Sequence, residues 1–270
     1  IKEYHRLRNT NFNNDNDDEI IEKIDFLFRQ AVKRAYEKDK EYGFKHLTFL
    51  SGGLDSRMTT WVANDMGYGD NIVNITFSQS DYLDEKIAKN IARDLRHEWI
   101  FKFLDNGIFL KNIEESTKVV GGAALYTSIA HGKSMFDLLN YDRFGIAHTG
   151  QIGDAIIGTF SQESGHGILT NENVQKIMYT PIPYDIKMTL SNYDNEEMFQ
   201  YYNRCFVGTN SGLLPVQEEL ETYSPFLDID FFEYCLTIPV KKRFNHQIYF
   251  KWILNKYPDA ANYDWERLHT

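Results

Sequence analysis

Apolar residues first recur at helical spacing between residues 17 and 38. Spacings of three and four positions predict one face of a helix of about five turns. This segment begins with acidic residues 17–19 and carries Lys33, Arg34 and Lys38 near its end, which are the charges that the two ends of a helix favour. The apolar positions of this face are Ile20, Ile24, Leu27, Phe28, Ala31 and Ala35.

Short apolar runs and amphipathic segments then alternate along the chain. The runs predict buried strands over residues 46–50, 71–77, 98–103 and 144–148. Helical faces follow the first two of these strands. Their apolar positions are Leu54, Met58, Trp61 and Val62, and then Leu83, Ile87, Ile91 and Leu95. Because strand–helix–strand order requires right-handed crossovers, the pattern predicts an α/β fold with a doubly wound parallel sheet.

The remaining segments are predicted to be mainly helical. Residues 107–140 have a helical pattern that Gly121 and Gly122 interrupt, and residues 160–222 have a weak one, with loops expected around Pro181 and Pro183. Residues 228–238 and 246–257 are predicted as two further helices.

Composition narrows the classes of function. The chain has 270 residues, which suits one large domain, and its formal net charge of -10 argues against binding to the phosphate backbone of a nucleic acid. It has no run of about 18 apolar residues, so no membrane span is expected, and no signal peptide is visible. The sequence begins at Ile1 and not at Met, so we expect it to be part of a longer chain.

The two cysteines, Cys205 and Cys235, are too few and too far apart for a metal motif or a disulfide framework. We expect them to be buried free thiols of a protein in a reducing compartment, and therefore a cytoplasmic protein.

The segment Ser51-Gly52-Gly53-Leu54-Asp55-Ser56 carries the clearest chemistry. Two glycines let backbone N–H groups approach a ligand closely, and the helix that follows points its N-terminus to the same place. Ser51 and Ser56 add hydroxyl groups. Asp55 would repel a bare phosphate, so its presence suits a site in which Mg²⁺ joins the carboxylate to a phosphate.

A plain strand-to-helix turn is the alternative for this segment, with glycine for its shape and Asp55 as a helix cap. The full hexapeptide between a strand and an amphipathic helix favours nucleotide binding instead. It also follows the first strand of the predicted sheet, at the edge where parallel sheets bind ligands.

The hexapeptide resembles the signature of the PP-loop ATP pyrophosphatases. Over residues 20–267 the chain is most similar to the synthetase domain of the asparagine synthetase and β-lactam synthetase family. Three further segments carry this resemblance. Residues 75–78 lie where the family's second strand supplies backbone groups to adenine. Thr149-Gly150-Gln151-Ile152-Gly153-Asp154 matches the family's Ser-Gly-Glu-Gly-Ser-Asp loop, and residues 221–228 match its Glu-x-Arg-x-Pro-Phe-Leu-Asp segment.

The resemblance implies a set of site residues. Mg²⁺ would be held by Asp55 and Asp154, and Gln151 and Arg267 fall on or near catalytic positions of the family. The positions implied for ATP are Leu50, Ser51, Gly52, Gly53, Asp55, Ser56, Thr76, Phe77 and Gly150. Residues of about 1–160 would form the nucleotide-binding core of a single domain over residues 1–270, and about 161–270 a mainly helical portion on the substrate side.

The implied activity is that of an ATP-dependent, AMP-forming amide ligase, as in asparagine biosynthesis. A small carboxylate substrate attacks the α-phosphorus of ATP, pyrophosphate leaves, and an amine or ammonia then displaces AMP from the acyl-adenylate. ATP and Mg²⁺ are the implied cofactors. No cysteine nucleophile of a glutaminase is found in these residues, which leaves open a glutaminase domain before Ile1.

Two departures from the family leave other functions open. Gln151 stands where asparagine synthetase has Glu, and an amide cannot act as a general base. Arg267 lies near the place of the family's C-terminal Lys, and a Lys after Thr270 is the alternative. A catalytically impaired nucleotide-binding module is therefore the second hypothesis. A tRNA-modifying or NAD-forming PP-loop enzyme is the third.

Other candidate residues have structural alternatives. We expect His131, in a predicted helix, to be a hydrogen-bonded structural residue, whereas His148 could line the nucleotide site or simply end its strand. The basic run Lys241-Lys242-Arg243 is expected to be a solvated turn.

Overall fold

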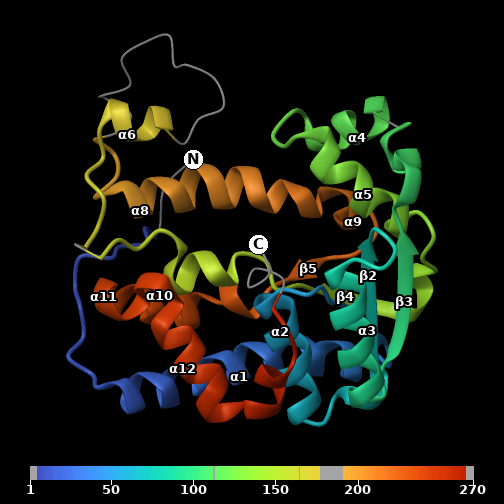
Figure 1. The fold of residues 1–270 in the computed structure, drawn as a ribbon, viewed down its shortest axis with the longest axis horizontal. Coiled ribbons are helices and arrows are strands. Elements are labelled where there is room, and N and C mark those ends of the chain that lie inside the picture. Colours follow the sequence, from blue (N-terminus) through green and yellow to red (C-terminus); the bar gives the residue numbers. More distant parts are fainter. Residues whose placement is uncertain (1–4, 112, 164, 177–190, 266–270) are drawn as a thin grey trace.

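The computed structural model describes residues 5–111, 113–163, 165–176 and 191–265 (Figure 1). In this part of the chain five strands form one parallel sheet in the order β3-β2-β1-β4-β5. They are β1 (Lys45–Phe49), β2 (Ile72–Ser78), β3 (Glu98–Phe103), β4 (Phe144–His148) and β5 (Thr222–Tyr223). The four predicted strands are confirmed. β5 was not predicted, because two residues are too few to show a pattern.

Helices cover both faces of the sheet, as the doubly wound prediction requires. Side chains alternate along β1: Leu47 and Phe49 face α5 (Tyr126–Phe136) and α9 (Leu214–Gln217), where Phe49 stacks on Phe136 with ring centroids 5.5 Å apart. Thr48 faces the opposite way and bonds the hydroxyl of Tyr36 on α1 at 3.1 Å. The helices of this second face are α1 (Asp17–Glu41), α2 (Leu54–Asp65) and α3 (Leu83–Leu95).

Helix α1 is longer than predicted. It has 25 residues, about seven turns, and continues to Glu41. Its start is as predicted, and a capping box of Asn16 and Glu19 fixes it. Glu19 donates its backbone N–H to the Asn16 side chain at 3.0 Å, and Asn16 donates its own N–H to the Glu19 carboxylate at 2.8 Å. The extra turns carry Asp39, whose contacts under β4 are described below.

The C-terminal helices pack on α1, the first helix of the chain (Figure 1). Phe28 contacts Phe226, Phe231 and Trp252, with ring centroids 4.7, 5.4 and 5.1 Å away. This cluster joins α1 to α10 (Ile229–Thr237) and α12 (Gln247–Lys256), the two helices predicted near the C-terminus. Burial of these rings removes a large apolar area from water and holds the ends of the chain together.

The middle of the chain is helical, as expected, but irregular. It contains α4 (Ile113–Val120), α6 (Asn171–Lys176), α8 (Glu196–Phe199) and a π-helix over Gln200–Gly208. The break at Gly121 and Gly122 is confirmed, since both have positive φ angles, and the two prolines at 181 and 183 lie outside the described residues.

The basic run near the C-terminus does not form the solvated turn that was expected. It lies in α11 (Val240–Arg243), and Arg243 is fully buried, where it pairs with the buried carboxylate of Glu197 at 2.5 and 3.1 Å. Within the described chain, no helix combines the length and the apolarity needed to cross a bilayer.

Candidate active site

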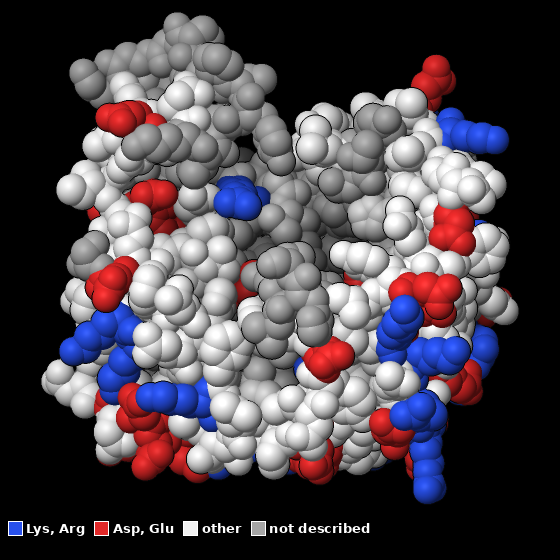
Figure 2. All heavy atoms as spheres, viewed as in Figure 1, with Lys and Arg blue, Asp and Glu red and all other residues white. Residues whose placement is uncertain are grey.

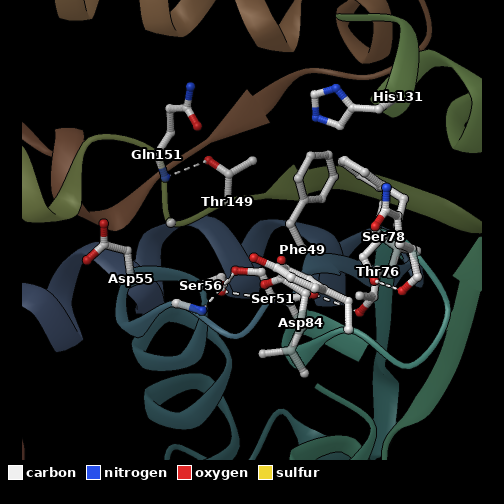
Figure 3. Close-up of a pocket in the computed structure, with 17 residues that line it drawn as sticks. Phe49, Ser51, Asp55, Ser56, Thr76, Ser78, Asp84, His131, Thr149 and Gln151 are labelled. Carbon is white, nitrogen blue, oxygen red and sulfur yellow. Dashed lines mark hydrogen bonds between the residues drawn. The ribbon is translucent and has the colours of Figure 1, made fainter. Parts of the chain in front are cut away.

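A cavity of about 690 Å³ opens at the carboxyl edge of the sheet. Its walls come from the segments that follow β1, β2 and β4, and β1 is the strand where the chain order reverses: β2 lies on one side of it and β4 on the other. Such a point in a parallel sheet leaves a crevice between diverging loops. Figure 3 shows Ser51, Ser56 and Asp84 on one side of this cavity, and Thr149, Gln151 and His131 on the other.

The loop after β1 folds back on the start of α2. Ser51 donates its backbone N–H to the hydroxyl of Ser56 at 3.0 Å, and the two hydroxyl groups lie 3.0 Å apart. Gly53 is the N-cap of α2 with an extended backbone, and its N–H donates to the Ser51 hydroxyl at 3.2 Å. The N-terminus of α2 lies beside the cavity, and the N-terminus of a helix favours an anion.

Asp84, in the first turn of α3, fixes the loop from the other side. Its carboxylate accepts the backbone N–H of Gly52 at 2.6 Å, and Asp84 itself lines the cavity. Sequence reasoning did not find this residue. The available signal was an acidic residue at the start of the helix that follows the second strand, but many helices have one for capping alone.

Two glycines let the loop after β4 lie directly on the start of α2. A Cβ added at Gly150 would lie 2.3 Å from the backbone nitrogen of Ser56 and 2.4 Å from the carbonyl carbon of Asp55. One added at Gly153 would lie 2.6 Å from the carboxyl carbon of Asp55. The atoms near Gly150 belong to the backbone and cannot yield at such distances, so only glycine permits this approach there; at Gly153 the side chain of Asp55 would have to move.

The same loop contains a strained residue. Ile152 has a φ of 69°, a left-handed conformation that is unfavourable for a β-branched side chain. In the family motif this position is the second glycine, so the backbone shape is kept while the side chain has changed. Ile152 is buried in the main core, which compensates for part of the strain.

Gln151 lies between this cavity and a neighbouring one and lines both. Its side-chain Nε2 donates to the carbonyl of Thr209 at 2.7 Å. The backbone carbonyl of Gln151 accepts a hydrogen bond of 2.9 Å from the hydroxyl of Ser224. This bond connects the loop to the Pro225–Asp228 segment. The amide side chain is therefore oriented by the segment that follows the π-helix.

Asp55 and Asp154 lie together beside the main cavity. The N–H of Asp154 donates to Asp55 Oδ2 at 2.8 Å, and the hydroxyl of Tyr249 donates to Asp55 Oδ1 at 2.9 Å. Both acidic residues line one small pocket of about 40 Å³. Burial, together with the negative charge of Asp55, raises the pKa of Tyr249, so it stays protonated and donates this bond. Tyr249 was not found from the sequence, because it comes from a helix at the other end of the chain.

This pair fits a hard divalent cation such as Mg²⁺. Oxygen atoms are the ligands that Mg²⁺ prefers, and carboxylates from two loops line one small pocket.

The end of β2 supplies backbone groups to the cavity. The Ile75 carbonyl accepts the Leu50 N–H at 3.0 Å towards β1, and the Ser78 carbonyl accepts the Leu104 N–H at 2.9 Å towards β3. Because successive residues alternate sides, Phe77 points its N–H and C=O towards β1, past the residue where β1 ends. The side chain of Thr76 bonds within the protein, since its hydroxyl donates to the Leu50 carbonyl at 2.7 Å.

The C-terminal segment reaches the same region through Arg57. This buried side chain donates to the carbonyls of Gly52, Tyr263 and Asp264 at 3.2, 3.2 and 2.5 Å. Trp265 lines the small pocket with Asp55 and Asp154. The catalytic candidate Arg267 lies outside the described residues.

A buried polar cluster supports β4 from below. Asp39 Oδ2 accepts His46 Nδ1 at 2.9 Å and His148 Nε2 at 2.7 Å, and its Oδ1 accepts the Ile146 N–H at 2.8 Å. Burial alone would raise the pKa of Asp39, but these hydrogen bonds outweigh it and lower the pKa. His148 is thus fully buried in this cluster, away from the cavity.

Most residues predicted from the sequence meet at this site. Gly52 lies in the loop, its N–H held by Asp84, and His131 lines the cavity with its ring centroid 5.2 Å from that of Phe77. The predicted residues that line the main cavity are Leu50, Ser51, Gly53, Asp55, Ser56, Thr76, Phe77, Gly150 and Gln151.

Comparison with known proteins gives one family. The family model described as asparagine synthase matches residues 23–166, which is more than half of the chain. No curated protein matches the chain.

Two of the solved structures that match have low sequence identity to this chain. An NH3-dependent NAD synthetase from Campylobacter jejuni subsp. jejuni has 15% identity and a TM-score of 0.36, with 90% of this chain and 98% of that chain covered. An NAD+ synthetase from Burkholderia pseudomallei has 11% identity and a TM-score of 0.32, with 92% and 98% covered. Likeness at this level carries no weight for fold or function.

Proposed function

The chain belongs to the asparagine synthase family, and from this premise we propose that it is an ATP-dependent, AMP-forming ligase that activates a carboxylate and transfers it to an amine or ammonia. The observation that carries the proposal is the meeting of two loops. The Ser51–Ser56 loop and the Thr149–Asp154 loop, remote in sequence, join at one cavity, and both acidic residues lie at its side.

We propose that ATP lies along the carboxyl edge of the sheet. Its pyrophosphate end would meet the amides at the start of α2 and the hydroxyl groups of Ser51 and Ser56. Its adenine would meet the backbone N–H and C=O of Phe77, which point into the space where β1 has ended. A cavity of about 690 Å³ has the size of a typical cofactor site.

Asp55 and Asp154 would hold Mg²⁺, which when bound neutralises charge on the phosphates. The chain's own contribution is the geometry of these two carboxylates, since Tyr249 and the Asp154 amide hold Asp55 in place.

The reaction proceeds in two steps. A carboxylate oxygen forms a bond to the α-phosphorus, and the bond from this phosphorus to the bridging oxygen breaks, so pyrophosphate leaves with the electron pair. The amine nitrogen then bonds to the acyl carbon, AMP leaves, and the nitrogen loses a proton to solvent or phosphate. Backbone amides at the loop stabilise the charge that develops on pyrophosphate. Gln151 can orient a carboxyl or amine group but cannot remove the proton.

The decisive experiment is carboxylate-dependent exchange of labelled pyrophosphate into ATP by the full-length protein. We expect exchange with the wild type and a loss of at least 100-fold in Asp55→Asn and Asp154→Asn. Asp142→Asn is the matched control, because Asp142 is exposed just before the amino end of β4, at the opposite edge of the sheet. Absence of exchange with every acid of a broad panel contradicts the ligase.

A catalytically impaired nucleotide-binding module is the second candidate. It is favoured by Gln151, whose amide supplies no base and is already bonded to Thr209. In that case ATP at 100 times its dissociation constant stabilises the fold by about 2.7 kcal/mol, while pyrophosphate release stays at background. The two candidates are separated by measuring both quantities on one sample.

We also propose that residues of about 161–270 form the substrate side of a single domain. The hydrogen bond from Gln151 to the Thr209 carbonyl supports this division, because it brings the second portion to the site.

We propose a reducing compartment such as the cytoplasm. Cys205 and Cys235 support it, because both are buried free thiols. Burial raises the pKa of both.

A further inference from the structure

A second cavity, of about 630 Å³, adjoins the first. It lies between α5, the Gly122–Leu125 turn and the π-helix with the turn that follows it. The two cavities share Phe49, Phe77, His131 and Gln151. A molecule in the second cavity would therefore lie beside the nucleotide proposed for the first. Figure 2 shows that this face of the molecule is hollowed beside the α4–α5 segment, with a basic group at the rim.

The walls of the second cavity are mainly apolar. Phe49 and Phe77 form its base at the sheet, Phe136 and Ile129 come from α5, and Leu213 comes from the opposite wall. Gly208 and Gly212 leave room on the side of the π-helix, since a Cβ added at Gly212 would meet nothing within 4 Å. Such a surface favours an apolar body of substantial size.

The second cavity has one arginine and no acidic residue among the described residues that line it. Among the described residues that line it, Arg204 is the only one with a formal charge at neutral pH when histidine is neutral, and none is acidic. Arg204 lies on the π-helix with its guanidinium 5.7 Å from the centroid of the Phe160 ring. One cation matches one carboxylate, whereas aspartate brings an ammonium and a second carboxylate, and these walls offer no acidic partner for that ammonium.

We propose that the acid activated by this chain is a bulky apolar monocarboxylate, with an aromatic or branched aliphatic body, and not aspartate. This inference rests on the proposed function, because it assigns the second cavity to the acid of that reaction. The body occupies the space between Phe49, Phe77 and Phe136. The carboxylate lies at the junction of the two cavities, oriented by Gln151 and drawn by the positive charge of Arg204.

The test uses 3-phenylpropanoate and L-aspartate as probes with the full-length protein. Binding is measured by calorimetry in the presence of Mg²⁺ and a non-cleavable α,β-methylene analogue of ATP, and activation by pyrophosphate exchange. We expect 3-phenylpropanoate to bind and to support exchange at least 10-fold better than L-aspartate.

Two substitutions add apolar volume at glycines that line the cavity. Gly208→Leu and Gly212→Leu add volume where a Cβ meets nothing closer than 4.0 Å, and neither glycine has a positive φ. Each should weaken 3-phenylpropanoate binding at least 10-fold and leave binding of the ATP analogue within twofold. Unchanged binding of 3-phenylpropanoate in both variants overturns the assignment of this cavity.

Substitutions of Arg204 test whether its charge binds the carboxylate. Arg204→Met should weaken binding of 3-phenylpropanoate at least 10-fold, and Arg204→Lys should restore most of it. Arg93→Met is the matched control, since Arg93 is exposed on α3 and paired with its neighbour Asp94. Equal losses in Arg204→Met and Arg93→Met contradict the role of Arg204.

The outcomes separate this inference from the ligase itself. Binding of 3-phenylpropanoate without exchange by any acid leaves the cavity assignment intact and rejects the ligase. Exchange with L-aspartate and none with 3-phenylpropanoate keeps the ligase and rejects the apolar acid. Absence of 3-phenylpropanoate binding also rejects the apolar acid.

Discussion

The backbone amide of Asp154 donates a hydrogen bond of 2.8 Å to the carboxylate of Asp55, across 99 positions of the sequence. This bond joins the loop after β4 to the first turn of α2. It also fixes the orientation of one acidic residue by the backbone of the other. The Asp55 carboxylate is therefore held against the backbone of the second acidic residue.

Gly150→Ala should disrupt this junction. Its Cβ would lie 2.3 Å from the Ser56 nitrogen, so the two loops must separate. We expect a loss of about 1–3 kcal/mol in the free energy of unfolding, and at least 10-fold weaker ATP binding. Urea unfolding and calorimetry measure the two effects. Gly212→Ala, at an open position, should change neither, and an unaltered Gly150→Ala protein would show that the loops tolerate separation.

Tyr249→Phe should weaken the site without removing a ligand. The change deletes the hydroxyl that donates to Asp55 and leaves the ring, so we expect about 1 kcal/mol of lost stability. Because Asp55 is then less fixed, Mg²⁺-dependent ATP binding should fall several-fold. Tyr234→Phe is the matched control: it loses a similar bond, to Asp15, at a distance from the site. Similar ATP affinities in the two variants would argue against positioning by Tyr249.

Stability should decrease as the pH falls from 6.5 to 4. Burial lowers the pKa of His97 from 6.5 to about 4. Between pH 6.5 and 4 the unfolded chain therefore binds a proton at this histidine that the folded protein does not bind. The stability that this group contributes is complete above pH 6.5 and is lost as the pH falls towards 4, on the order of 3 kcal/mol. Burial also lowers the pKa of His148, which adds to the same trend.

The measurement is the free energy of unfolding at several pH values for the wild type and His97→Gln. The variant should be less stable at neutral pH, because bonds to Asn64 and Asn74 are weakened, but its slope between pH 6.5 and 4 should be shallower. Parallel slopes in the two proteins would contradict the assignment to His97.

Asp39→Asn should destabilise the protein by about 3 kcal/mol, because it removes the buried charge that joins His46 to His148. Glu41→Gln, an exposed change at the end of the same helix, should have little effect. The three side chains also have the composition of a metal site. The 2.7 and 2.9 Å bonds to one oxygen are hydrogen bonds, so EDTA should leave the melting temperature unchanged. A fall on chelation in the wild type that Asp39→Asn abolishes would instead assign a metal to the cluster.

Local patterns were sufficient for much of the fold and for the first half of the site. The four longer strands and the helices around them follow from periodicity, because burial against a sheet imposes it. The Ser51–Ser56 loop is also local, since its two glycines and the start of a helix lie within six residues. Neither the two-residue β5 nor the burial of Arg243 leaves such a trace, because each depends on a distant partner.

The sequence by itself determined the parallel α/β fold, the loop that faces the nucleotide edge, and the family. The tertiary structure decided what surrounds that loop. Asp84, Tyr249 and Arg57 reach it from α3, α12 and α2, and Gly150 fits against Ser56 only because β4 lies next to β1. The reason is physical: periodicity records which face of an element is buried, but contacts between distant residues depend on how those faces pack in three dimensions.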